Sequence, residues 1–207
     1  MNALIVVDMQ NDFMDDGALA VPGSRDLVET INELMESPVF DLVVATQDWH
    51  PADHGSFASN HEGKEPGQVI ELDGLEQILW PTHCVQGSEG AEFVDGLNTD
   101  RFDTVFEKGM NPLVDSYSGF YDNGHREDTG LADYLREQDI KSVYVCGVAT
   151  DYCVKFTVLD ACKEGFNTKL IWDATEGVEL NEGDVGVALS QMLDAGSGIV
   201  KKKLVFK

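Results

Sequence analysis

The sequence predicts an α/β protein in which a mostly parallel sheet lies between two layers of helices. Short apolar segments alternate along the chain with segments whose apolar residues recur at helical spacing. The apolar segments also lack the alternation of apolar and polar residues that is typical of strands with one solvent-exposed face. This indicates strands that are buried on both faces. At 207 residues the chain can bury one substantial core. We therefore expect one domain over residues 1–207.

The first half of the chain contains two predicted strands and one predicted helix. Residues 3–8 (ALIVVD) and 41–48 (DLVVATQD) are short and apolar, as expected for buried strands. Between them, residues 24–35 carry apolar side chains at helical spacing, and Ser24 is the expected N-cap. Residues 49–100 are irregular and rich in Gly, Pro and His, so we expect only short elements there. Loops this long inside a compact domain are usually functional or mobile.

The second half continues the alternation of strands and helices. The predicted elements are, in order, a strand at 103–109, a loop at 110–128, a helix from about Thr129, a strand at 142–147, a helix at 153–164 closed by Gly165, a strand at 168–174, a helix at about 182–195 and a last strand within 199–206.

Composition excludes several classes of function. The formal net charge is −24, so the chain lacks the Lys and Arg surface that nucleic acids and acidic membranes require. A small neutral or cationic substrate fits this charge better than an anionic one. No apolar run is long enough to span a bilayer, and the first residues (MNALIVVD) lack a signal-peptide layout. These features predict a cytoplasmic protein.

The four cysteines are too few and too scattered for a disulfide framework, and none forms a C-x-x-C pair. We expect reduced thiols that serve packing or chemistry. Cys146 and Cys162 are interpreted as core residues, and Cys84 is left open between the two roles.

Ionisable side chains follow four of the predicted strands. Asp8 ends the first strand, Asp48 the second and Lys108 the third, and the segment 147–153 follows the fourth. Ligands of parallel sheets bind beyond the carboxyl ends of the strands, so these groups are expected to meet at one edge. For any single residue, a strand end meeting solvent is an equally good explanation.

Cys153 is the candidate nucleophile among these groups. It lies where a helix should begin, and the free N–H groups and dipole of a helix N-terminus lower the pKa of a thiol. Lys108 could lower this pKa further, and Asp8 could accept the thiol proton. The alternative is that Cys153 only packs in the core, as free cysteines often do.

Five segments of the chain resemble those of nicotinamidases, a branch of the isochorismatase-like cysteine hydrolases. The segments are VVDMQNDF (6–13), TQDWHPADHGSFA (46–58), WPTHCVQGSEGA (80–91), FEKG (106–109) and CGVATDYCV (146–154). The resemblance implies a six-stranded parallel sheet flanked by helices in three layers. It also implies hydrolysis of nicotinamide, and of the isosteric pyrazinamide, in NAD recycling.

The resemblance assigns catalytic roles to three side chains. It implies a triad of Asp8, Lys108 and Cys153, in which the thiolate of Cys153 forms a thioester with the substrate. It places the oxyanion hole on the backbone N–H groups of Ala149 and Cys153, next to a cis peptide bond between Val148 and Ala149.

The resemblance also implies one divalent transition metal ion held by Asp48, His50 and His83, with Zn first and Mn or Fe as alternatives. This ion is expected to position the pyridine nitrogen of the substrate. His54 is left outside the ligand set, and Glu62 and Glu65 are interpreted as solvent-facing charges.

Phe13, Trp80 and Tyr117 match positions that line the substrate pocket in the family, whereas Trp49 is left unassigned. Three alternatives remain at this point. The first is another member of the superfamily without the metal, such as an isochorismatase-like or N-carbamoyl amide hydrolase. The others are a hydrolase that uses metal-activated water with Cys153 as a bystander, and a catalytically silent metal or ligand carrier. Family members range from monomers to larger assemblies, so the sequence leaves a homo-oligomer open.

Overall fold

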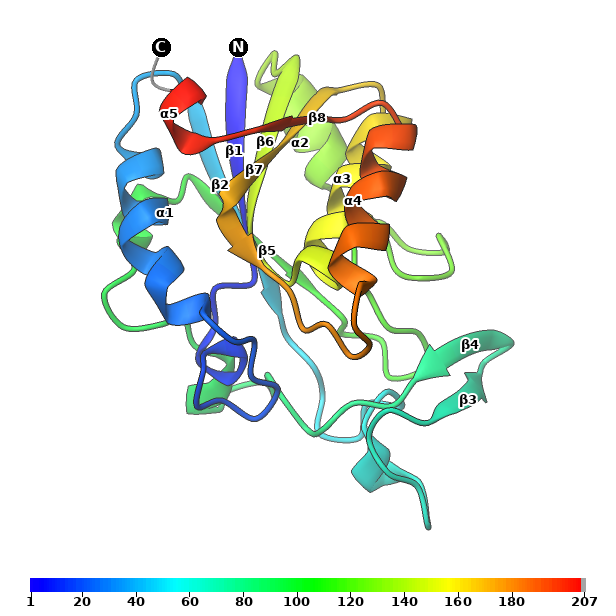
Figure 1. Cartoon of the computed structure of the whole chain (residues 1–207). Helices are drawn as coiled ribbons and strands as arrows, with labels where there is room; N and C mark the ends of the chain where they lie inside the picture. Colours follow the sequence, from blue (N-terminus) through cyan, green and yellow to red (C-terminus); the bar gives the residue numbers. More distant parts are fainter. Residues whose placement is uncertain (206–207) are drawn as a thin grey trace.

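The computed structural model describes residues 1–205, and its main feature is one sheet of six parallel strands (Figure 1). The strand order is β5-β2-β1-β6-β7-β8, and every neighbouring pair is parallel. The strands are β1 (Asn2–Val7), β2 (Leu42–Asp48), β5 (Thr104–Lys108), β6 (Ser142–Val148), β7 (Asn167–Glu176) and β8 (Gly198–Val200). The predicted fold class and the six-stranded parallel sheet are confirmed.

Helices cover both faces of the sheet and complete three layers (Figure 1). On one face, α1 (Leu27–Met35) and α5 (Lys202–Val205) pack against a core that includes Leu4 and Val6 of β1. On the other face, α2 (Leu131–Glu137), α3 (Lys155–Lys163) and α4 (Asp184–Asp194) pack against Ile5 and Val7. Successive side chains of β1 therefore enter two different cores, which is why its sequence is apolar throughout.

The structure differs from the prediction at the start of α1 and in the extent of the last strand. Ser24 does not cap α1: it lies in a 3-10 turn, Ser24–Asp26, and no described residue bonds its buried hydroxyl. Asp26 takes the N-cap position instead, without a side-chain bond to the helix. The last strand is short, and residues 202–205 are helical where the sequence suggested more strand; Phe206 of that stretch lies outside the described residues.

The stretch at 49–100 contains only short elements, as predicted. These are the hairpin of β3 (Val69–Leu72) and β4 (Leu75–Ile78) and three 3-10 turns, Ala58–Asn60, Glu89–Ala91 and Thr99–Arg101. The hairpin is separate from the main sheet and lies beyond the carboxyl ends of its strands (Figure 1). Residues 49–100 therefore contribute walls around the edge at which the ionisable side chains meet.

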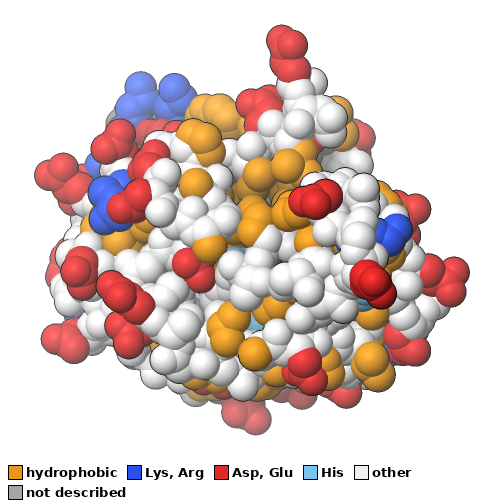
Figure 2. Space-filling view, turned by 90° about the horizontal axis from the view of Figure 1, so that it is seen from below, with side chains coloured by type: hydrophobic (Ala, Val, Ile, Leu, Met, Phe, Trp, Pro, Cys, Tyr) orange, Lys and Arg blue, Asp and Glu red, His pale blue; other side chains and the backbone are white. Residues whose placement is uncertain are grey.

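The face at the carboxyl ends of the strands has an apolar centre. Seen from that side, apolar side chains gather around a hollow, and acidic side chains lie mainly at the margin (Figure 2). Within residues 1–205, no helix has both the length and the apolar character needed to cross a membrane.

Candidate active site

The strand ends bring three of the sequence-predicted residues to one place. Asp8 directly follows β1, Lys108 is the last residue of β5, and β2 lies between these strands. Asp48 ends β2 and is the register partner of Lys108. Asp8 has a φ of +49°, in the left-handed region that Asp tolerates better than most residues, and this turns the chain out of β1.

Lys108 is the centre of a buried cluster. Its Nζ lies 2.9 Å from Asp8 Oδ2 and 3.5 Å from Cys153 Sγ, and it also donates hydrogen bonds to Asp48 Oδ1 and to the carbonyl of Ser116. Carboxylate oxygens of Asp8 and Asp48 and the Cys153 sulfur all lie within 4.8 Å of one another. The structure thus brings together the acid, the amine and the thiol that the sequence placed on separate strands.

The charges within this cluster favour an ion pair and a protonated thiol. Burial opposes the charged form of Lys108, but Asp48 and Asp8 raise its pKa well above the usual value. Burial raises the pKa of Asp8, and Lys108 offsets this only in part. Burial likewise raises the pKa of Cys153 well above that of a free thiol, although Lys108 acts in the opposite direction. The predicted lowering of the Cys153 pKa is therefore wrong for the protein without a bound ligand, because desolvation outweighs the lysine.

Cys153 lies in a five-residue turn, Thr150–Val154, which precedes α3 and winds more widely than an α-helix. The peptide bond between Val148 and Ala149 is cis, as the resemblance implied. Gly147 permits this path, because a Cβ there would lie 2.1 Å from the carbonyl oxygen of Val7 and its φ is +105°. The Cys153 side chain is 7% exposed and lines a cavity, so it is not sealed in the core.

A second cluster contains the three predicted metal ligands. Asp48 Oδ2 lies 3.5 Å from His50 Nε2 and 3.8 Å from His83 Nε2, and all three side chains are buried. His50 Nδ1 is 2.8 Å from the carbonyl of Gly109, and His83 Nδ1 is 2.8 Å from that of Pro81. A carbonyl only accepts hydrogen bonds, so each Nδ1 carries a proton and each Nε2 is directed at Asp48, where a neutral ring would offer its lone pair to a cation. One carboxylate and two such imidazoles fit a divalent transition metal.

Asp48 belongs to both clusters, with Oδ1 toward Lys108 and Oδ2 toward the imidazoles. Burial disfavours its charge, but Lys108 and His50 hold its pKa well below the usual value. Gly109 makes room for this arrangement, because a Cβ there would lie 2.3 Å from the His50 ring. The carboxylate is therefore ionised and available to a cation.

His54 lies beside this cluster. Its ring is 4.4 Å from that of His50, and its Nδ1 accepts a hydrogen bond from the backbone N–H of Ser56. Its Nε2 is buried and has no partner among the described residues. Burial lowers the pKa of His54 to about 4, so the ring is neutral near pH 7. It groups with His50 and Asp115 and is absent from the Asp48–His50–His83 set.

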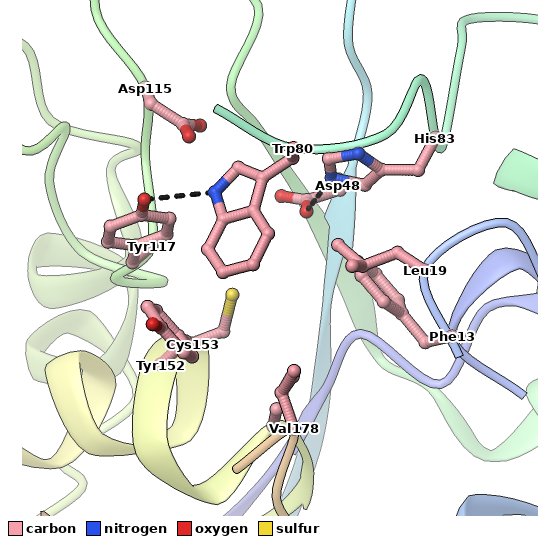
Figure 3. A pocket seen from close by; sticks show the side chains of 11 residues that line it. Phe13, Leu19, Asp48, Trp80, His83, Asp115, Tyr117, Tyr152, Cys153 and Val178 are labelled. Atoms are coloured by element: carbon pink, nitrogen blue, oxygen red, sulfur yellow. Dashed lines mark hydrogen bonds and ion pairs between the residues drawn. The ribbon is translucent and has the colours of Figure 1, made fainter. Parts of the chain in front are cut away.

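Both clusters face one cavity (Figure 3). Cys153 lies on one part of its wall, and Asp48 and His83 lie on another. The three predicted aromatic residues, Phe13, Trp80 and Tyr117, line the space between them.

Sequence reasoning missed several residues that line this cavity. They are Asp115, Leu19, Tyr152 and Val178. Leu19, Asp115 and Val178 lie in loops without regular periodicity, so no pattern in the sequence marked them. Asp115 accepts a hydrogen bond from Gln77, which also bonds the hydroxyl of Tyr117. The hairpin thus supports one wall of the cavity.

Other residues from the sequence analysis lie away from the cavity wall. Trp49 packs against the core on the α1 side of the sheet, and Glu62 and Glu65 are exposed. All four cysteines are free thiols. Cys84 and Cys146 are fully buried, and burial raises the pKa of each thiol, so both serve packing.

Comparison with known proteins gives the family. Residues 2–200 match the isochorismatase domain. The chain belongs to the isochorismatase family. Within this family, the nicotinamidase of Escherichia coli (strain K12) is 50% identical over 197 residues, which cover 94% of this chain and 92% of that protein.

Solved structures of other family members share the fold closely. An Acinetobacter baumanii nicotinamidase/pyrazinamidase superimposes with a TM-score of 0.94 at 46% sequence identity. The match covers 99% of this chain and 97% of the other. The pyrazinamidase of Pyrococcus horikoshii, solved in complex with zinc, has a TM-score of 0.78 at 40% identity; the match covers 97% of this chain and 98% of the other.

Proposed function

We propose that this chain is a nicotinamidase that hydrolyses nicotinamide to nicotinate and ammonia and also accepts pyrazinamide. One observation carries the proposal: a single cavity with aromatic walls holds a cysteine sulfur at one part of its wall and an Asp–His pair at another. A pyridine carboxamide has matching chemistry, with an electrophilic carbon and a ring nitrogen on the same flat ring. The relatives named above support the same activity.

The cavity walls orient the substrate in this proposal. Phe13 and Trp80 are buried, and the indole Nε1 of Trp80 donates a hydrogen bond to the Tyr117 hydroxyl at 3.0 Å. This bond holds the indole and phenol rings in fixed positions, so they can present faces and edges to a flat ring. A substrate held in this way has its carboxamide directed at Cys153 before any chemistry occurs.

The first chemical step is acylation of Cys153. Asp8 takes the proton of the thiol, and the sulfur attacks the carboxamide carbon, so that the carbonyl electrons move to oxygen. The raised pKa of Cys153 means that the thiolate forms only as this proton leaves. Lys108, 3.5 Å from the sulfur and 2.9 Å from Asp8, stabilises negative charge on either partner.

Collapse of the tetrahedral adduct then releases ammonia. Backbone N–H groups of Ala149 and Cys153 are the proposed donors to the oxyanion. Protonated Asp8 returns its proton to the departing nitrogen, which leaves as ammonia, and a thioester with Cys153 remains. A water molecule, deprotonated by Asp8, cleaves the thioester and yields nicotinate and the free thiol.

Asp48, His50 and His83 would hold a divalent metal ion, of which zinc is the leading candidate because a zinc complex of the Pyrococcus horikoshii pyrazinamidase is known. When bound, such an ion supplies a Lewis-acid contact for the pyridine nitrogen. The proton transfers and the nucleophilic attack are carried by the protein side chains alone.

Ammonia release from nicotinamide, measured on the purified protein with and without prior chelation, tests the proposal. We expect turnover in the untreated protein and a large rise in KM after chelation. Rapid acid quenching followed by mass spectrometry should show the nicotinoyl adduct on the peptide that contains Cys153. Absence of ammonia release from both nicotinamide and pyrazinamide by metal-loaded protein would overturn the assignment.

A further inference from the structure

The rim of the cavity contains a segment that belongs to no helix or strand. Val178 lines the cavity and lies in the connection between β7 and α4, at residues 177–183. In the close view Val178 lies across the cavity from Trp80, and Leu19 lies beside Phe13 (Figure 3). These two aliphatic side chains narrow the cavity without offering any polar group to a substrate.

A buried carboxylate holds this segment in place. Asp151 is 2% exposed, and its two oxygens accept hydrogen bonds from the backbone N–H groups of Val178 (3.0 Å) and Glu179 (2.7 Å). No basic side chain within residues 1–205 lies in ion-pair distance of Asp151. Among the described residues, these two N–H groups are its hydrogen-bond donors, and the charge of Lys155 also interacts with Asp151. Hydrogen bonds to a buried carboxylate are strong.

The same carboxylate belongs to the turn that carries the nucleophile. Asp151 lies two residues before Cys153, in the turn Thr150–Val154. A second bond joins the turn to the end of β7, directly before the Val178 segment, because the hydroxyls of Thr150 and Thr175 lie 2.8 Å apart. Gly177 lets the segments approach, since a Cβ there would lie 2.3 Å from Val185 and 3.2 Å from Asp151 Oδ1.

We infer that Asp151 is a positioning residue that sets the size of the ring the cavity admits, by fixing Val178 at a constant distance from Cys153. The inference rests on the proposed hydrolysis of a pyridine carboxamide. A ring that reaches Cys153 shares the cavity with Val178. The hydrogen bonds of the Val178 and Glu179 N–H groups to Asp151 keep Val178 from moving away from the nucleophile turn. Single-ring carboxamides fit, whereas fused-ring carboxamides meet Val178.

The test compares two variants that loosen the rim by different means. Asp151→Asn keeps the side-chain volume but directs an amide group at one of the two N–H donors. Val178→Ala shortens the rim and leaves Asp151 and the nucleophile turn intact, so it remains informative if the first variant folds poorly. Asp103→Asn is the control, because Asp103 also accepts a backbone N–H bond, from Val43, but precedes β5 at the opposite edge of the sheet.

Steady-state kinetics with nicotinamide and with quinoline-3-carboxamide give the first readout. For Asp151→Asn we expect KM for nicotinamide to rise roughly tenfold with a smaller change in kcat, the factor that corresponds to one lost charge-assisted hydrogen bond. In both rim variants the ratio of kcat/KM for the fused-ring substrate to that for nicotinamide should rise. Asp103→Asn should keep the wild-type ratio.

Alkylation of Cys153 gives a readout that does not depend on the proposed reaction. Rates of modification by iodoacetamide and by the larger N-phenylmaleimide are measured at Cys153 by mass spectrometry, with half-buried Cys162 of α3 as the internal reference. We expect the ratio of the modification rate with N-phenylmaleimide to that with iodoacetamide to rise at Cys153 in both rim variants. The same ratio at Cys162 should not change. An unchanged ratio in both variants would overturn the inference. If wild-type protein released no ammonia from nicotinamide, the proposed function would fail, and the alkylation ratio would still decide the role of Asp151.

Discussion

Lys108 donates a hydrogen bond to Asp48 and thereby joins the cluster around Cys153 to the cluster of imidazoles. The two residues are register partners on the neighbouring strands β5 and β2. Lys108 is fully buried, and within residues 1–205 it forms ion pairs with the two carboxylates beside it, which compensate its charge. This arrangement makes the lysine a structural element in addition to its proposed catalytic role.

Replacement of Lys108 by Met should therefore destabilise the protein. Two buried carboxylates, those of Asp8 and Asp48, would lose their counter-charge, which typically costs about 3–5 kcal/mol of unfolding free energy. The loss of unfolding free energy should be largest near neutral pH. It should become smaller as the pH falls, because protonation of the two carboxylates removes their uncompensated charges. Urea unfolding of chelator-treated protein at several pH values measures it.

Lys163→Met is the control for this measurement. Lys163 is exposed and pairs with Asp160, so we expect a change below about 1 kcal/mol without the same pH trend. Equal losses in the two variants would show that the Lys108 cluster does not have the energetic role inferred here.

Cys153→Ala should abolish turnover and preserve binding. Loss of a nucleophile lowers kcat by about 10⁴-fold or more, whereas nicotinamide binding rests on the cavity walls, which this change leaves intact. Ammonia release and calorimetric titration with nicotinamide separate the two effects. Cys162→Ala should retain wild-type turnover. Substantial activity in Cys153→Ala would instead favour attack by metal-activated water.

Thr46→Val should shift the acid limb of the kcat/KM profile to higher pH. Thr46 Oγ1 donates a hydrogen bond of 2.6 Å to Asp8 Oδ1, which stabilises the ionised carboxylate and lowers its pKa. Asp8 must be ionised in the free enzyme to accept the thiol proton. Removal of the donor raises the Asp8 pKa. As the pH is lowered, the variant should therefore lose activity about one pH unit above the wild type.

Thr168→Val is the matched control for this shift. The Thr168 hydroxyl is also buried but bonds the carbonyl of Phe166 at the start of β7, away from the cavity. Its profile should coincide with that of the wild type. A Thr46→Val profile that kept the wild-type acid limb would contradict the assignment of Asp8 as the proton acceptor.

His83→Ala should remove metal and weaken substrate binding. One of two imidazoles facing Asp48 is lost, so metal content after dialysis should fall and KM for nicotinamide should rise at least about tenfold. Elemental analysis and kinetics measure both quantities. The control is His125→Ala, at an exposed histidine stacked on Tyr121. Retention of stoichiometric metal and wild-type KM by His83→Ala would exclude His83 as a ligand.

The approach of Asp8, Asp48 and Lys108 to one another could be anticipated from the sequence, because the ends of parallel strands share an edge. The same rule could not find Asp115, Leu19 or Val178. Their positions depend on where long loops fold back over that edge, and no periodic pattern encodes this. The N-cap assigned to Ser24 failed for a related reason: a 3-10 turn precedes α1 and moves its N-cap by two residues, to Asp26.

The sequence by itself determined the alternation of buried strands with helices, because strands covered on both faces must be apolar throughout, as β1 is. Through motif resemblance, it also indicated which side chains would meet. Only the tertiary structure decided that the pKa of Cys153 is raised, because burial among distant segments outweighs the nearby lysine. The same is true of the bonds from Asp151 to the Val178 segment, because they join residues 27 and 28 positions apart that neither periodicity nor motif connects.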